Sequence, residues 1–217
     1  MTKTKTHKNY IRFSIYSFIL FGLLAYMVFS SDIIRLLDLK VSSYFFSIQN
    51  SFLTYIMFLI NWITAPVMLV IAVIFAIISL VGRYKHLEAI ILISSIGFGA
   101  VVTWCLKNIL AISRPDIQLV SALSKYAFPS GHTTMSVIFF FLIAVFIGSH
   151  VLNKYREEFV FFCAFAVILI GISRLYLGVH WFSDVAGGLL LGTSISFLGL
   201  YCYEKLKDKK QFWTLGV

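Results

Sequence analysis

Proline, cysteine and acidic residues are scarce in this chain of 217 residues, which has 3 prolines, 3 cysteines and 9 aspartates plus glutamates. Cys105, Cys163 and Cys202 lie in or beside apolar runs and form no CxxC or Cys/His pair. This pattern argues against both a disulfide framework and a zinc site. It favours three small hydrophobic residues that are buried by packing.

Charged residues are also few, at 12% of the chain, whereas 60% of the residues are hydrophobic. A composition of this kind predicts an integral membrane protein, because a transmembrane helix needs about 20 consecutive apolar residues. Such segments recur near 11–29, 64–82, 88–106, 133–149, 159–178 and 185–203. We therefore predict an all-α integral membrane protein that forms one domain, 1–217, with six transmembrane helices.

Two parts of this layout need an interpretation. The basic, then apolar, N-terminus has the look of a signal peptide, but no A-x-A-like cleavage site follows, so we interpret 11–29 as a retained first helix. The apolar run from Phe52 to Val81 is too long for a simple span and is interrupted by Asn61 and Pro66. We interpret 43–62 as an interfacial helix that leads into the second span.

The net charge of +9 follows the predicted topology. Six spans place alternate loops on the same side, and 12 basic residues fall on the side with both termini against 6 on the other. The first set is Lys3, Lys5, Lys8, Arg12, Arg83, Lys85, Lys154, Arg156, Lys205, Lys207, Lys209 and Lys210, and the second is Arg35, Lys40, Lys107, Arg114, Lys125 and Arg174. This asymmetry predicts cytoplasmic termini, and no basic groove with interleaved aromatic residues indicates nucleic-acid binding.

Three segments on the outer side lie at predicted membrane boundaries, and together they contain two histidines and three cationic side chains. They read KNILAISRP (107–115), PSGH (129–132) and SRLYLGVHWFSD (173–184). A phosphoryl group in transfer spreads negative charge over its oxygens, and Lys107, Arg114 and Arg174 can stabilise that charge. Arginine offers a planar fork to two oxygens, whereas lysine acts as a mobile point charge.

The second segment opens the fourth predicted span. The Ser130 hydroxyl and the free N–H groups of that first turn form a candidate anion site, and Gly131 allows a close backbone approach. In the third segment, the i, i+4 spacing puts His180 and Asp184 on one helical face if the sixth helix begins there.

Position for position, the three segments resemble the K-x6-R-P, P-S-G-H and S-R-x5-H-x3-D signature of the type 2 phosphatidic acid phosphatase superfamily. The resemblance implies a six-span lipid phosphatase with its active site at the outer membrane boundary. It implies that His180 attacks phosphorus to form a phosphohistidine, that His132 protonates the leaving group, and that Asp184 fixes the tautomer of His180. The scheme needs no metal or cofactor, because the cations already neutralise the phosphate.

The expected function is therefore hydrolysis of a lipid phosphomonoester or pyrophosphate in a bacterial cytoplasmic membrane, with the site on the extracytoplasmic side. Phosphatidylglycerophosphate, undecaprenyl pyrophosphate and phosphatidic acid are the candidate substrates, selected through the segments 30–60 and 116–128. Two alternatives are phosphotransfer to another hydroxyl by the same residues and a small transporter or channel. The oligomeric state is left open.

Smaller features carry further expectations. Gly188 and Gly192 form a GxxxG pattern, which indicates close helix packing and, as a weaker alternative, dimerisation. Asp116 is interpreted as a turn residue after Pro115. Four aromatic residues near the motifs are candidates either for an acyl entrance or for an aromatic belt, namely Tyr126, Phe128, Tyr176 and Trp181.

Overall fold

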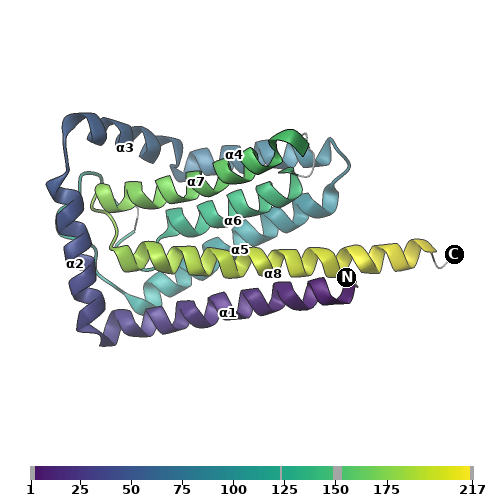
Figure 1. Ribbon diagram of the computed structural model, residues 1–217, viewed down its shortest axis with the longest axis horizontal. Helices are drawn as coiled ribbons and strands as arrows, with labels where there is room; N and C mark the ends of the chain where they lie inside the picture. The colour runs from purple at the N-terminus through teal and green to yellow at the C-terminus, as the bar shows by residue number, and fades with distance from the viewer. Residues whose placement is uncertain (1–2, 123, 149–152, 216–217) are drawn as a thin grey trace.

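The computed structural model describes residues 3–122, 124–148 and 153–215, and within them every regular element is helical. The all-α prediction is confirmed. The α-helices are α1 (Lys3–Ser30), α2 (Asp32–Ser47), α3 (Ser51–Ile63), α4 (Pro66–Val81), α5 (His86–Leu110), α6 (Gly131–Phe146), α7 (Arg156–Tyr176) and α8 (Phe182–Leu215), with a short 3-10 helix at Asn153–Tyr155 (Figure 1).

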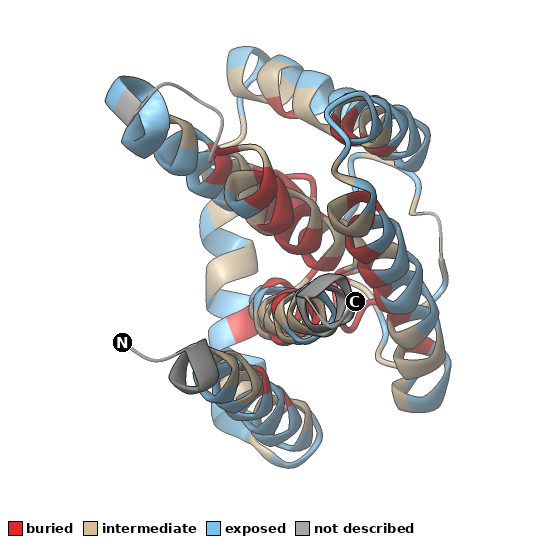
Figure 2. Ribbon diagram, turned by 90° about the vertical axis from the view of Figure 1, so that its right-hand side faces the viewer, coloured by how far each residue is buried: buried red, intermediate tan, exposed pale blue. Residues whose placement is uncertain are grey.

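Helix α8 forms the centre of the bundle. It lies beside α1 along most of its length and packs against α6, α5 and α7 (Figures 1 and 2). Two serines join α1 to α8 reciprocally, since the Ser14 hydroxyl donates to the Ser194 carbonyl at 2.8 Å and the Ser194 hydroxyl donates to the Ser14 carbonyl at 2.9 Å. Such bonds contribute to helix association where apolar surface alone provides little drive.

Glycines on α8 allow α6 to approach closely. A Cβ atom at Gly188 would lie 2.8 Å from the Ser130 carbonyl oxygen, and one at Gly192 would lie 2.7 Å from Val137 Cβ and 2.8 Å from the Thr134 carbonyl oxygen. The GxxxG pattern therefore serves packing within the chain, as the first of its two interpretations predicts. This contact brings the start of α6 against the start of α8, where the motifs lie.

Substituting Gly192 tests this packing. We expect Gly192→Ala to lower the free energy of unfolding by about 1–3 kcal/mol, because the new methyl group meets rigid backbone and a Cβ atom and forces a shift. Gly97→Ala on α5 is the matched control, since no heavy atom lies within 4 Å of its Cβ position. Thermal unfolding in detergent measures both; equal midpoints for the two variants would show that the α6–α8 contact is not tight.

The number of membrane crossings is only partly settled by helix length. Four helices, α1, α5, α7 and α8, are long and apolar enough to span, and α3 and α4 together form a fifth candidate that is bent by 52°. Helix α6 has 16 residues and measures about 24 Å, which is shorter than a hydrocarbon core of about 30 Å. The described residues thus contain four to five candidate spans, and six crossings stay a prediction.

The expected single helix over 43–62 is wrong. Its residues belong to the end of α2 and to α3, which are separated because Asn50 adopts an extended conformation and its side chain accepts a hydrogen bond from the Leu53 N–H at 3.0 Å. A polar side chain in this position caps a new helix. Helix α4 begins at Pro66 for a different reason: proline fits the first helical turn, where its missing N–H is not needed.

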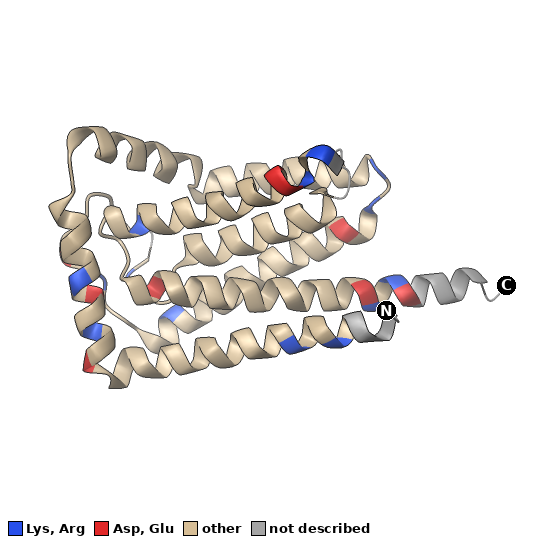
Figure 3. Cartoon of the chain, viewed as in Figure 1, with Lys and Arg blue, Asp and Glu red and all other residues tan. Residues whose placement is uncertain are grey.

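The ends of the helices alternate between two ends of the bundle. The start of α1 and the end of α8 lie at one end, together with the connection between α4 and α5, whereas α2 runs across the opposite end (Figure 1). Charged residues lie near both ends of the bundle, and the middle has almost none among the residues coloured by type (Figure 3). The end crossed by α2 is where the three motifs meet.

Candidate active site

The three motifs converge at the end of the bundle that α2 crosses. Their residues occupy the last turns of α5 and α7, the starts of α6 and α8, and the two loops between these helices. Six of the eight expected site residues line one cavity of about 680 Å³; these are Lys107, Arg114, Gly131, His132, Arg174 and His180. The remaining two, Ser130 and Asp184, lie fully buried just behind them.

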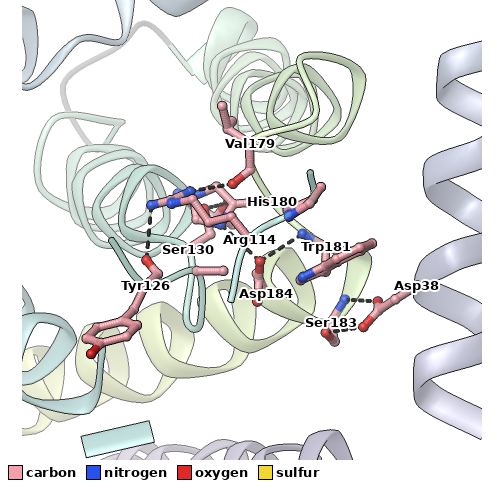
Figure 4. A network of polar contacts seen from close by, with 12 residues as sticks. Asp38, Arg114, Tyr126, Ser130, Val179, His180, Trp181, Ser183 and Asp184 are labelled. Carbon is pink, nitrogen blue, oxygen red and sulfur yellow. Dashed lines mark hydrogen bonds and ion pairs between the residues drawn. The ribbon is translucent and has the colours of Figure 1, made fainter. Parts of the chain in front are cut away.

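His180 and Asp184 form an oriented pair at the start of α8. His180 Nδ1 lies 3.1 Å from Asp184 Oδ2, which also accepts a hydrogen bond from the Trp181 N–H at 2.8 Å (Figure 4). Because the carboxylate can only accept, Nδ1 carries the proton. The Nε2 atom, 3.4 Å from Arg114 Nη1, is then the ring nitrogen with a lone pair.

The electrostatic surroundings keep His180 neutral. Burial lowers the pKa of its imidazole well below the usual value, and the three neighbouring cations lower the pKa further. A histidine with a lowered pKa stays unprotonated as the pH falls below about 6.5, its ordinary value. The lone pair on Nε2 is therefore available at neutral and mildly acidic pH.

Ser130 joins two of the motifs. Its N–H donates to the Asp184 carbonyl oxygen at 2.9 Å, and its hydroxyl oxygen accepts hydrogen bonds from the Thr133 hydroxyl at 3.0 Å and, more weakly, from the Thr133 N–H at 3.5 Å. The side chain is thus the N-cap of α6, as expected, but it is not among the residues that line the cavity. Gly131 and His132 present the first turn to the cavity instead.

Two of the cations are tied to the loop between α5 and α6. Lys107 Nζ donates to the carbonyl oxygens of Tyr126 at 2.8 Å and Ala127 at 2.7 Å. Arg114 donates to the carbonyl oxygens of Ser124 at 2.8 Å and Tyr126 at 3.1 Å, and to that of Val179. Burial lowers the pKa of Arg114, but a guanidinium stays charged in proteins.

The third cation has a partner that the motifs do not include. Arg174 is 1% exposed, and its Nη1 donates to Asn61 Oδ1 on α3 at 2.8 Å. Its Nε and Nη2 both donate to the Ser173 hydroxyl at 3.1 Å. In the sequence, Asn61 was noted only as an interruption of an apolar run. Its polarity within that run was the one indication that it could bond to a site residue. It holds the guanidinium against the cavity wall.

The loop after α7 is fixed by a close contact. Gly178 has a φ of +68°, and a Cβ atom there would clash with the Ile117 carbonyl oxygen. The Leu119 N–H donates to the Leu177 carbonyl oxygen at 3.0 Å beside it. A residue without a Cβ is required where the backbone has this conformation and this neighbour. The contact holds the 117–119 segment against the turn that carries His180.

Away from the cations the cavity becomes apolar. Its walls come from α4, α5 and α6, and its apolar side chains include Pro66, Leu69, Trp104, Met135, Phe139 and Phe140. The segment 116–128 contributes Val120, Ser121, Ala122 and Ser124, whereas 30–60 contributes none of the described lining residues. The cavity is thus amphipathic, with charge at one end and hydrocarbon at the other.

The four aromatic residues that flank the motifs do not form an entrance. None of them lines the cavity, and Phe128 and Tyr176 are almost completely buried, at 0% and 1% exposed, so neither belongs to an aromatic belt. Their rings fill the interior: Phe128 stacks on Phe21 of α1, and the Tyr176 hydroxyl lies 2.9 Å from the Thr54 hydroxyl on α3. Proximity in sequence to a site residue therefore did not show whether an aromatic side chain lines the cavity or packs behind it.

Within the described residues no group of three or more His, Cys, Asp or Glu side chains lies close enough to hold a metal ion. Asp116 lies in an exposed bend after Pro115, as the sequence predicts. The nitrogen donors and cations of the site are suited to a phosphate-sized anion.

The fold and the site define an all-α, multi-pass membrane protein with a histidine nucleophile candidate in a cationic cavity. The model of the PAP2 superfamily matches residues 88–208, which include all three motifs, and the chain belongs to this family of metal-independent phosphatases. It is the family that the three motifs resemble.

Individual relatives agree with this assignment. The chain is 32% identical over 129 residues to phosphatidylglycerophosphatase B of Bacillus subtilis, an alignment that covers 58% of this chain and 64% of that protein. It is 32% identical over 88 residues to an undecaprenyl-diphosphatase of Sulfolobus acidocaldarius, which covers 40% of this chain and 38% of that protein. The alignments therefore span less than two thirds of these curated relatives.

A solved structure is similar over more of the fold. The crystal structure of a transmembrane PAP2-type phosphatidylglycerolphosphate phosphatase from Bacillus subtilis superposes with a TM-score of 0.80 at 26% identity, over 91% of this chain and 96% of that one. The similarity extends beyond the matched family segment to the N-terminal helices.

Proposed function

We propose that this protein is a lipid phosphate phosphatase that hydrolyses a phosphomonoester or pyrophosphate through a phosphohistidine at His180. The observation that carries the proposal is the buried His180 imidazole, whose Nδ1 lies 3.1 Å from Asp184 Oδ2, in a cavity that three cations also line. A nucleophile oriented by a third group and positioned among charge-stabilising donors is the arrangement that covalent catalysis requires.

The cations and the first turn of α6 would bind the phosphate. Lys107, Arg114 and Arg174 supply positive charge to the cavity, and the first N–H groups of α6 have no partner within the helix. Ser130 contributes by capping that turn. Together these groups stabilise the charge that develops on the equatorial oxygens in the transition state.

The reaction would proceed in two displacements. His180 Nε2 attacks phosphorus, the bond to the leaving oxygen breaks, and protonated His132 donates its proton to that oxygen. Burial and the neighbouring cations lower the pKa of His132 to about 3, so His132 would take up this proton when the negatively charged phosphate enters the cavity. His132 then takes a proton from water, the water oxygen attacks the phosphohistidine, and the N–P bond breaks to release inorganic phosphate and restore both histidines. Asp184 stabilises the charge that His180 gains in the first step.

The apolar part of the cavity supports a lipid substrate. A headgroup phosphate among the cations would leave its hydrocarbon chain against α4 and α6, where Leu69, Met135 and Phe139 line the wall. The relatives named above act on phosphatidylglycerophosphate and an undecaprenyl diphosphate, so these two lipids and phosphatidic acid are the first candidates. A cavity of this size holds a headgroup with the first part of a chain.

The purified protein tests this proposal directly. We expect inorganic phosphate to be released from at least one of the three lipids in the presence of a chelator and without an added acceptor, because the fixed cations supply the charge that a metal would. Phosphate release that strictly requires magnesium would contradict the mechanism. Consumption of the lipid only when a second lipid or sugar hydroxyl is supplied would favour phosphotransfer instead.

The orientation in the membrane is part of the proposal. The basic residues are concentrated at the end with both termini, so this end would be cytoplasmic and the active site would face outward, with six crossings. In a variant without native cysteines, we expect Gln118→Cys to react with an impermeant thiol reagent on intact cells and Lys154→Cys to stay protected. Both positions are exposed, so the reverse pattern, or equal labelling, would overturn the orientation.

A further inference from the structure

A buried carboxylate lies on α2, outside all three motifs. Asp38 is 7% exposed and is the one buried residue of this helix, whereas its apolar neighbours Ile33 and Leu36 are 75% and 64% exposed. Burying a charged side chain is costly unless hydrogen bonds compensate. On α2 the charged residue is buried and the apolar residues are exposed, so we expect a hydrogen-bond partner for the buried carboxylate.

That partner is Ser183, the second residue of α8. Its N–H donates to Asp38 Oδ1 at 2.8 Å and its hydroxyl donates to Asp38 Oδ2 at 2.7 Å, so one residue engages both carboxylate oxygens (Figure 4). Burial raises the pKa of Asp38, and the two bonds from Ser183 oppose that rise. The side chain thus makes two strong, charge-assisted hydrogen bonds in a protected place.

Asp38 performs for α8 what an N-cap residue performs for other helices. The first N–H groups of a helix need acceptors, and the indole of Trp181, just before the helix, cannot accept a hydrogen bond. Helix α2 supplies the missing acceptor from a distant part of the chain, because it crosses the bundle directly over the start of α8 (Figure 1). A negative charge at this helix end also interacts favourably with the helix dipole.

The first turn of α8, to which Asp38 is bonded through Ser183, also orients the proposed nucleophile. Ser183 adjoins Asp184, whose carboxylate contacts His180 Nδ1 at 3.1 Å and the Trp181 N–H at 2.8 Å. The two carboxylates therefore fix the same turn: Asp38 from α2, and Asp184 from within α8. A change in the direction of this turn would alter the angle at which His180 Nε2 meets phosphorus.

We propose that Asp38 is a positioning residue for the reaction, which acts by holding Ser183 so that Asp184 and His180 keep their relative orientation. This inference rests on the proposed function, in which His180 is the nucleophile. Asp38 does not line the cavity, so its removal should affect the chemical step and leave substrate binding intact. Correct orientation of reacting groups contributes strongly to rate.

Three variants of purified protein in detergent test the proposal. We expect Asp38→Ala to lower kcat by about 10–100-fold, by analogy with the partners that orient metal-bound histidines, with KM changed by no more than about threefold. Asp38→Asn should stay within about threefold of the unmodified protein, because the amide can still accept from the Ser183 N–H and donate to its hydroxyl oxygen. Ser183→Ala keeps the backbone bond and should fall between these two.

The matched control is Asp32→Ala, which removes an exposed carboxylate from the first turn of the same helix and should leave kcat unchanged. The rate of phosphohistidine formation in a single turnover should fall in parallel with kcat for Asp38→Ala. Equal kcat values for Asp38→Ala and the control would overturn the proposal, as would a change confined to KM. If Asp38→Ala does not fold, an unaltered kcat in Ser183→Ala overturns it.

These outcomes are separate from failure of the proposed function. An unmodified protein that consumes none of the three lipids, with or without an added acceptor, would refute the proposed function and, with it, the role of Asp38. An active protein whose Asp38 variants match the control would refute only the positioning role.

Discussion

His180→Ala is expected to abolish turnover and to eliminate the covalent intermediate with every substrate. Removing a nucleophile costs on the order of 10⁶-fold in kcat in a well-studied hydrolase, and no other imidazole in this cavity is paired with a carboxylate among the described contacts. The measurement is acid-labile phosphohistidine trapped during turnover with a labelled lipid phosphate, together with steady-state phosphate release.

The matched control for this variant is His86→Ala. His86 is exposed and begins α5 at the end of the bundle away from the site, so its loss should change neither the adduct nor kcat. Adduct formation that survives in His180→Ala would assign the nucleophile elsewhere. Because His180 is almost fully buried, thermal unfolding of the variant should be measured alongside, to separate a lost nucleophile from a lost fold.

His132→Ala is expected to produce a large loss that depends on the leaving group. A general acid contributes about 10²–10⁴-fold when the departing oxygen needs a proton, and far less when that oxygen leaves easily as an anion. Alkyl phosphates such as phosphatidic acid should therefore lose most of their rate, whereas an aryl phosphate with an acidic phenol should retain much of it. The quantity to compare is kcat/KM for the two substrate types in each variant.

The two histidine variants should thus differ in kind. His132→Ala should still form the phosphohistidine from an aryl phosphate, although its hydrolysis slows because the attacking water loses its base. His180→Ala should form none from any substrate. If His132→Ala lacks the adduct and His180→Ala retains it, the two roles are reversed; an equal loss on alkyl and aryl phosphates would contradict a proton-donor role for His132.

The site could be predicted from the sequence where its residues form local patterns. The sequence paired His180 with Asp184, although not as one helical face, because α8 begins at Phe182 and Asp184 reaches back to His180 from the first turn. The segments 107–115, 129–132 and 173–184 were recognisable together, by their order and internal spacings. Their convergence follows once each is assigned to the same end of a helical bundle. Helix periodicity and hydrophobic length were enough for that assignment.

The supporting residues could not be predicted, because they come from distant helices. Asn61 reaches Arg174 across 113 positions and Asp38 reaches Ser183 across 145, and no local pattern relates such pairs. The division between α2 and α3 lies at a short polar stretch, residues 47–51, which was wrongly expected to lie within one helix over 43–62. Its signal was Asn50, the side chain that caps the start of α3. The buried position of Ser130 likewise depends on how α6 meets α8.

The hydrogen bonds from Lys107 and Arg114 to the loop carbonyls have a consequence for product release. Inorganic phosphate is an anion, as is the phosphate group of the substrate, so a site of bare cations would hold it tightly and slow each cycle. Here the carbonyl oxygens of Ser124, Tyr126 and Ala127 are within hydrogen-bonding distance of the same cations. As the phosphate departs, these dipoles can take over its hydrogen bonds one at a time. In the proposed mechanism the cations would therefore not be left unsolvated in a buried place, because neutral acceptors would replace the departing anion and lower the barrier to its release.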